Sequence, residues 1–78
     1  MTDIEQKVIQ CAADAYLVDA SAITLDTNVR EELSNQSLKL VVFISTIEEE
    51  LDVMIEIRDA AKLKTIRDFV DKVIQLAG

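Results

Sequence analysis

The chain has no histidine, no proline and no tryptophan, and its single glycine is Gly78. Without histidine, the Ser-His and Cys-His pairs that activate nucleophiles in most hydrolytic enzymes cannot be assembled. Cys11 is the only cysteine, so an intramolecular disulfide is excluded and a cysteine-based metal cluster has too few ligands. No apolar run is long enough to span a membrane, and no low-complexity tract or internal repeat interrupts the chain. We therefore expect no hydrolytic site, no resident metal and no stable membrane insertion.

Aromatic residues are also scarce, since only Tyr16, Phe43 and Phe69 occur among 78 residues. Isoleucine, leucine, valine and alanine must then build most of the core of one small domain over residues 1–78. Fifteen acidic residues against eight basic ones give a net charge of −7, which disfavours nucleic acid and favours basic protein surfaces as partners. The start of the chain has no basic region followed by an apolar run, so we expect a cytoplasmic protein, and a monomer.

Helix signals occur at both ends of the chain. Thr2 and Glu5 form a capping-box pattern that predicts a first helix from about residue 3 to 16. Its apolar stripe contains Ile4, Val8, Cys11, Ala12 and Ala15. Cys11 is interpreted as a small buried hydrophobe, because no cationic neighbour is evident to lower its pKa; the alternative is a reactive thiol.

Thr65 with Asp68 predicts the cap of the last helix. The stripe of that helix contains Ile66, Phe69, Val70, Val73 and Ile74.

The segments between the helices are predicted from turn chemistry. Residues 17–36 break the helical period and predict a long loop. The apolar residues expected to pin this loop onto the helices are Val18, Ile23, Leu25, Val29 and Leu33. The length of the loop would let the first and second helices run roughly parallel. Residues 52–57 predict an extended connector, and residues 58–63 a single short helix. The expected fold class is all-α: a four-helix bundle with a long loop between helices one and two and a short third helix.

The most informative stretch is the predicted second helix, over residues 37–51. Its inward apolar residues are expected to be Leu38, Val41, Phe43, Ile44, Ile47 and Leu51. Ser34 or Asn35 can accept hydrogen bonds from the unpaired amides of the first turn. Ser37 lies at the amino end, where free N–H groups and the helix dipole favour a negative group such as a phosphate ester. Taken alone, Ser37 is better explained as an ordinary first-turn residue, because polar residues are common at helix starts.

This stretch resembles the second helix of the acyl carrier proteins. Their signature is Asp-Ser-Leu followed at a fixed distance by Glu-Glu-Glu and a large apolar residue. The residues that match this pattern in register are Ser37, Leu38, Glu48, Glu49, Glu50 and Leu51. The chain departs from the family where Ser34-Asn35-Gln36 replaces Gly-x-Asp and where Lys39 replaces a common acid. The resemblance extends over almost the whole chain and implies the same helical architecture.

The resemblance implies a carrier and not an enzyme. In the family, a phosphopantetheinyl transferase moves 4′-phosphopantetheine from coenzyme A onto the signature serine, and acyl groups ride on that arm as thioesters. Ser37 is the matching attachment residue. The implied partners are the transferase and acyl-transferring, ligating or condensing enzymes with basic docking patches. The cargo and its pathway are left open: fatty acid, polyketide, lipopolysaccharide and other specialised routes all fit. The resemblance also implies that the acyl chain is sheltered inside the bundle.

Five residues of the second helix are expected to contact partners: Leu38, Leu40, Val42, Glu48 and Glu49. Glu48 and Glu49 would meet Arg or Lys on partner enzymes; the alternative is that they only solvate the helix end. Leu40 and Val42 are expected to be exposed and to form an apolar strip beside Lys39; the alternative is a wider buried face. Two other functions stay open: an interaction domain without the prosthetic group, suggested by Gln36 and the missing glycine, and a peptidyl or aminoacyl carrier.

Overall fold

A capping box begins the first helix, as the sequence predicts. In the computed structural model, which describes residues 1–78, helix α1 spans Asp3–Tyr16. The Thr2 hydroxyl accepts a hydrogen bond from the Glu5 N–H at 3.2 Å, and the Glu5 carboxylate accepts one from the Thr2 N–H at 2.6 Å. These bonds satisfy amides that an isolated helix start would leave unpaired. A second capping box, at Thr65, begins α4, which spans Ile66–Ala77.

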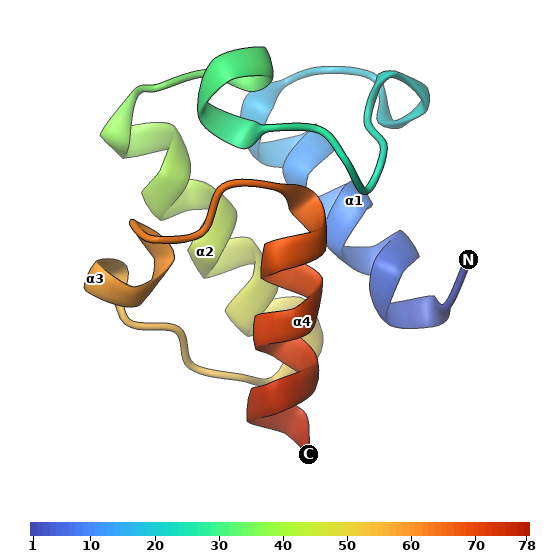
Figure 1. Ribbon diagram of the computed structural model, residues 1–78, viewed down its shortest axis with the longest axis vertical. Helices are drawn as coiled ribbons and strands as arrows, with labels where there is room; N and C mark the ends of the chain where they lie inside the picture. Colours follow the sequence, from blue (N-terminus) through green and yellow to red (C-terminus); the bar gives the residue numbers. More distant parts are fainter.

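The remaining helices complete an all-α bundle, which confirms the predicted fold class. Helix α2 spans Ser37–Leu51, and the short α3 spans Ile57–Ala60, close to the segment 58–63 where a short helix is predicted. Helix α1 packs against both α2 and α4. Figure 1 shows α1 running in the opposite direction to α2 and α4. The expected parallel arrangement of the first two helices is therefore wrong.

The reason for the antiparallel arrangement lies in the loop between α1 and α2. The loop stays over one end of the bundle, where it forms a 3-10 turn, η1 (Ala20–Ala22), and a π-helical turn, η2 (Val29–Leu33). Three backbone hydrogen bonds tie it to the start of α4. Val29 N–H donates to the Lys64 carbonyl at 2.9 Å, Ile66 N–H to the Thr27 carbonyl at 3.1 Å, and Arg67 N–H to the Leu25 carbonyl at 2.9 Å. The chain thus enters α2 near the point where it left α1.

The apolar residues of the loop behave mostly as predicted. Ile23 and Val29 are buried, and Leu25 and Leu33 are partly buried against the core. Val18 is exposed, so its predicted role as an anchor is wrong. Burial of these side chains holds the loop against the core.

The three aromatic rings form a row through the core. Tyr16 of α1 meets Phe43 of α2 edge-on, with ring centroids 5.8 Å apart, and Phe43 meets Phe69 of α4 at 4.8 Å. Phe43 and Phe69 are essentially inaccessible to solvent. Aromatic rings bury more surface than other side chains, so this row is the main packing link among the three long helices.

The connector between α2 and α3 is extended, as predicted. Val53 and Ile55 are buried while Met54 between them is exposed. The Glu48 carboxylate of α2 accepts a hydrogen bond from the Ile55 N–H at 2.9 Å and so anchors the connector, a contact that the sequence did not reveal. In α4, Ile74 is half exposed and does not belong to the buried stripe predicted for it.

Candidate functional site

Ser37 is exposed and is the first residue of α2. Gln36 precedes the helix with an extended backbone, and its side chain makes no capping hydrogen bond. The Ser34 hydroxyl accepts a hydrogen bond from the Gln36 N–H at 3.1 Å, outside the helix, so the expected cap from Ser34 or Asn35 is wrong. No acidic side chain lies in the first turn of α2. The free N–H groups there are left for an external acceptor, and an anion is favoured at this position.

Ser37 lies at the edge of a groove with a volume of about 380 Å³. Side chains from α1, η2, α2 and the α3 region form its walls. The apolar ones are Tyr16, Leu40, Val41, Ile57 and Ala61. The polar ones are Arg30, Ser34, Asn35, Gln36 and Ser37. A volume of this size is in the lower part of the range for small-molecule sites.

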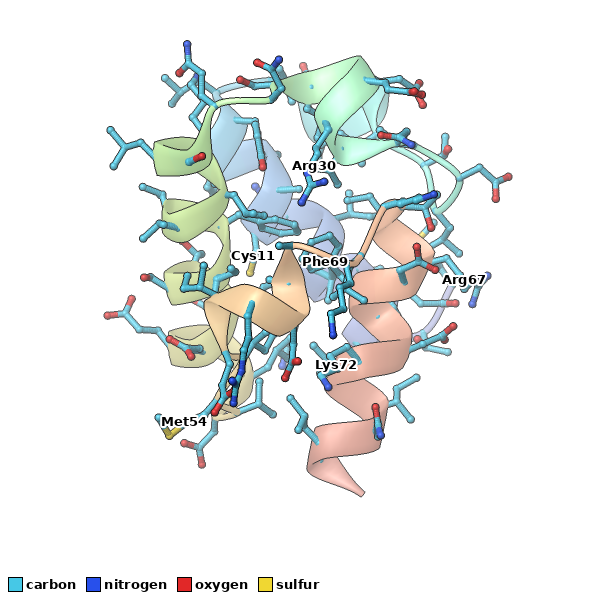
Figure 2. The ribbon with its side chains drawn as sticks, turned by 60° about the vertical axis from the view of Figure 1, so that its left-hand side comes forward. Cys11, Arg30, Met54, Arg67, Phe69 and Lys72 are labelled. Carbon is cyan, nitrogen blue, oxygen red and sulfur yellow. The ribbon has the colours of Figure 1, made fainter.

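Arg30 closes one side of this groove. Figure 2 shows its side chain reaching from η2 toward α3, where its Nη2 donates a hydrogen bond to the Ala61 carbonyl. The residue is exposed and makes no ion pair with any carboxylate of the chain. Its positive charge therefore lies beside Ser37 without being neutralised by a neighbouring side chain.

Tyr16 provides a buried polar group at the same groove. The side chain is only 4% exposed, and its hydroxyl has no hydrogen-bond partner. Burial raises the pKa of the Tyr16 hydroxyl, and the charge of Arg30 opposes that rise in part. The hydroxyl is therefore protonated at neutral pH and can donate a hydrogen bond.

Tyr16 and Arg30 were not among the site residues expected from the sequence. Arg30 carries one weak signal, since no other basic residue occurs between Lys7 and Lys39. Tyr16 carries none, because an aromatic residue in the last turn of an apolar helix is typical of a core.

The apolar residues of α2 are distributed differently from the prediction. Leu38 is 74% exposed and Val41 is also exposed, so their assignment to the inward set is wrong. Leu40 is half-buried and packs against the core, which contradicts its expected exposure, whereas Val42 is exposed as expected. The helical period explains this result: Leu40 shares a face with the buried Ile44 and Ile47. The apolar strip beside Lys39 consists of Leu38, Val41 and Val42.

The acidic end of α2 has two kinds of carboxylate. Glu48 is half-buried and bonded to the Ile55 amide, so it has a structural role. Glu49 is exposed and makes no side-chain hydrogen bond or ion pair in the chain. Glu49 is therefore free to meet a charge on another molecule.

Cys11 is buried, as predicted, and lies outside the groove beside Ser37. Burial, with smaller contributions from Glu50 and Asp14, raises the pKa of its thiol from 9.0 to about 11. No cluster of side chains suited to hold a metal ion is present, and no helix is long and apolar enough to cross a membrane.

The thiol of Cys11 should react slowly in the folded protein. The rise of the pKa from 9.0 to about 11 lowers the thiolate fraction at neutral pH about 100-fold, and the thiolate is the reactive form. We expect a chromogenic disulfide reagent to react at least about 100-fold faster in concentrated urea than in native buffer. Equal rates in the two conditions would show that Cys11 is accessible and reactive.

Comparison with known proteins gives an independent assignment. Residues 6–73 match the family described as phosphopantetheine attachment site. An acyl carrier protein from Rubrobacter xylanophilus is 36% identical over 73 residues, which cover 94% of this chain and 90% of the relative. Members of this family are carriers, not enzymes, and hold 4′-phosphopantetheine covalently. The chain belongs to the phosphopantetheine-binding acyl carrier protein family.

Proposed function

We propose that the protein carries 4′-phosphopantetheine on Ser37. The observation that carries this proposal is the exposed Ser37 side chain at a helix start that has neither a side-chain cap nor an acidic residue in its first turn. A phosphodiester on the Ser37 oxygen would lie near the free N–H groups of that turn. Lys39, in the same turn, adds a positive charge that forms no ion pair in the chain.

The groove beside Ser37 also suits the phosphopantetheine arm, which contains both hydrocarbon and amide groups. Its apolar wall includes Leu40, Val41 and Ile57, which can pack against hydrocarbon. Its polar wall includes Asn35 and Gln36, which can bond amides. The chain has no histidine, and no general base lies among the groove residues, so the transferase must supply the base that takes the Ser37 proton.

The arm supplies a thiol on which acyl groups are held as thioesters. The chain itself presents the serine, keeps α2 rigid through the aromatic row, and offers a charged surface for successive enzymes. Covalent attachment keeps the acyl group at a high effective concentration for each of them. We place these enzymes in lipid or related biosynthesis, with a phosphopantetheinyl transferase as the first partner, and we keep the cytoplasm as the expected location.

The direct test is labelling of the wild-type protein. Incubation with coenzyme A, magnesium and a broad-specificity transferase should add one prosthetic group, seen by intact mass spectrometry. Peptide mapping should place the added mass on the peptide that contains Ser37. If several transferases leave the folded protein unlabelled, the alternative of an interaction domain without the prosthetic group becomes the better explanation, with Gln36 and the missing glycine as its motivation.

Partner docking should depend on Glu49. Reversal of its charge in Glu49→Lys would replace attraction to a basic enzyme surface by repulsion. We expect transfer from a partner enzyme at low salt to slow by roughly three- to tenfold, mainly through association, with a smaller effect at high salt. Stopped-flow or initial-rate measurements over a range of salt concentrations test this.

Glu48 provides the matched control for that experiment. Glu48→Gln removes one negative charge but keeps an oxygen that can accept the hydrogen bond from Ile55. The free energy of unfolding of both variants should stay within about 0.5 kcal/mol of the wild type. If Glu49→Lys transfers as fast as the wild type at low salt, the acidic end of α2 is not a docking surface.

A further inference from the structure

The groove beside Ser37 contains a polar group that the protein leaves without a partner. The Tyr16 side chain lines this groove, is 96% buried, and has a hydroxyl with no hydrogen bond. A buried hydroxyl without a partner costs stability, and most buried polar groups in folded proteins are satisfied. An exception of this kind requires an explanation, and an external hydrogen-bond acceptor would provide one.

The other polar groups of the groove favour an acceptor as well. Arg30 adds a guanidinium, and the amides of Asn35 and Gln36 can donate. No aspartate or glutamate lines the groove. The edge-on contact with Phe43, at a centroid distance of 5.8 Å, limits movement of the Tyr16 ring and so fixes the place of its hydroxyl. The groove thus combines apolar side chains with several hydrogen-bond donors.

We propose that this groove favours an acyl group bearing an acceptor oxygen, such as a hydroxyl, keto or carboxylate group, over a plain hydrocarbon chain of the same length. The inference rests on the proposed attachment at Ser37, which is at the edge of the same groove. Tyr16 donates to the oxygen, and Arg30 adds a positive charge that favours an anionic group. A plain chain would fill the apolar wall but leave the Tyr16 hydroxyl unsatisfied. The acyl group enters with the arm, so no further bond is made or broken in the groove.

The test compares three forms of the wild-type protein, each loaded at Ser37 by the transferase. Coenzyme A gives the free arm, butanoyl-coenzyme A a plain four-carbon chain, and 3-hydroxybutanoyl-coenzyme A a chain of equal length and charge with one oxygen. We expect the hydroxybutanoyl form to unfold at a temperature about 4–8 °C above the butanoyl form, the shift for one ordinary hydrogen bond in a domain of this size. Scanning calorimetry measures both transitions.

Variants assign the effect to the hydroxyl. Tyr16→Phe removes only that group, and the difference between the two loaded forms should disappear. Thr46→Val is the matched control, because it removes a hydroxyl that donates to the Val42 carbonyl of its own helix, away from the groove. That variant should keep the full difference.

A second readout needs no variant, because Tyr16 is the only tyrosine in the chain. In protein labelled with ¹³C-tyrosine, the Cζ signal should move on loading with hydroxybutanoyl and stay in place on loading with butanoyl. Equal signals and equal unfolding temperatures for these two forms would overturn the inference. A change already complete in the free-arm form would assign the hydroxyl to the arm's own amides and would also overturn it. Absence of any adduct is a different result, and it would refute the attachment at Ser37.

Discussion

Ser37→Ala should abolish the prosthetic-group adduct completely under conditions in which the wild-type protein is fully labelled. The Ser37 hydroxyl is the only serine oxygen that combines exposure with the uncapped start of α2 and a place at the groove edge. Alanine has no atom that can form the phosphate ester. It is also a good helix former, so α2 should persist. Intact mass spectrometry measures the loss, and circular dichroism confirms that the variant remains helical.

Two other serines serve as controls. Ser45 is exposed in the middle of α2, and Ser34 lies in the groove but precedes the helix. Ser45→Ala and Ser34→Ala should both be labelled once, like the wild type. An adduct on Ser37→Ala would show that the attachment site lies elsewhere.

Gln36→Asp tests the departure from the family pattern at the residue before the serine. If transferases read an acid there, this variant should be labelled at least as fast as the wild type. An aspartate at this position can also cap the free N–H groups of α2. The free energy of unfolding of the variant should therefore rise by about 0.5–2 kcal/mol. Slower labelling of a more stable variant would indicate that the free amides, rather than a missing acid, assist the modification.

The sequence predicted those parts of the fold that depend on local chemistry. Thr2 with Glu5, and Thr65 with Asp68, mark two helix starts because a capping box is a contact between residues three apart. Ser37 was singled out by the resemblance to the acyl carrier proteins, because its place at a helix start alone favours an ordinary first-turn serine, and its role as the attachment residue stays a prediction. The extended connector over residues 52–57 was likewise predicted, whereas the burial of Val53 and Ile55 and the exposure of Met54 were not.

The rest of the site depends on contacts between distant segments. Tyr16 and Arg30 meet at the groove only because the loop returns over the end of the bundle, and no spacing in the sequence encodes that path. The same loop makes α1 and α2 antiparallel where the sequence suggested parallel helices. Leu38 and Leu40 were misplaced for a different reason: α2 is apolar on more than one face, so periodicity alone did not separate inside from outside.

Phe43→Ala should be the most damaging core substitution, with a loss of about 3–5 kcal/mol in the free energy of unfolding. Phe43 is fully buried and is the middle ring of the aromatic row, in contact with Tyr16 on one side and Phe69 on the other. Alanine would leave a cavity at the point where α1, α2 and α4 meet. A domain of 78 residues has a total stability of roughly 4–12 kcal/mol, so the variant would be close to unfolding at room temperature. Urea titration followed by circular dichroism measures the change.

Val42→Ala, one residue earlier on the exposed side of α2, is the matched control, and it should cost about 0.5 kcal/mol or less. The two variants together test whether α2 has one buried face, with Phe43 inside and Val42 available for partners. Equal losses would show that the face assignment is wrong.

The packing also bears on function, because Phe43 holds both the helix that begins at Ser37 and the ring of Tyr16. Labelling of Phe43→Ala should therefore fall with its unfolded fraction as urea is added, while Val42→Ala is modified at the wild-type rate until its own transition.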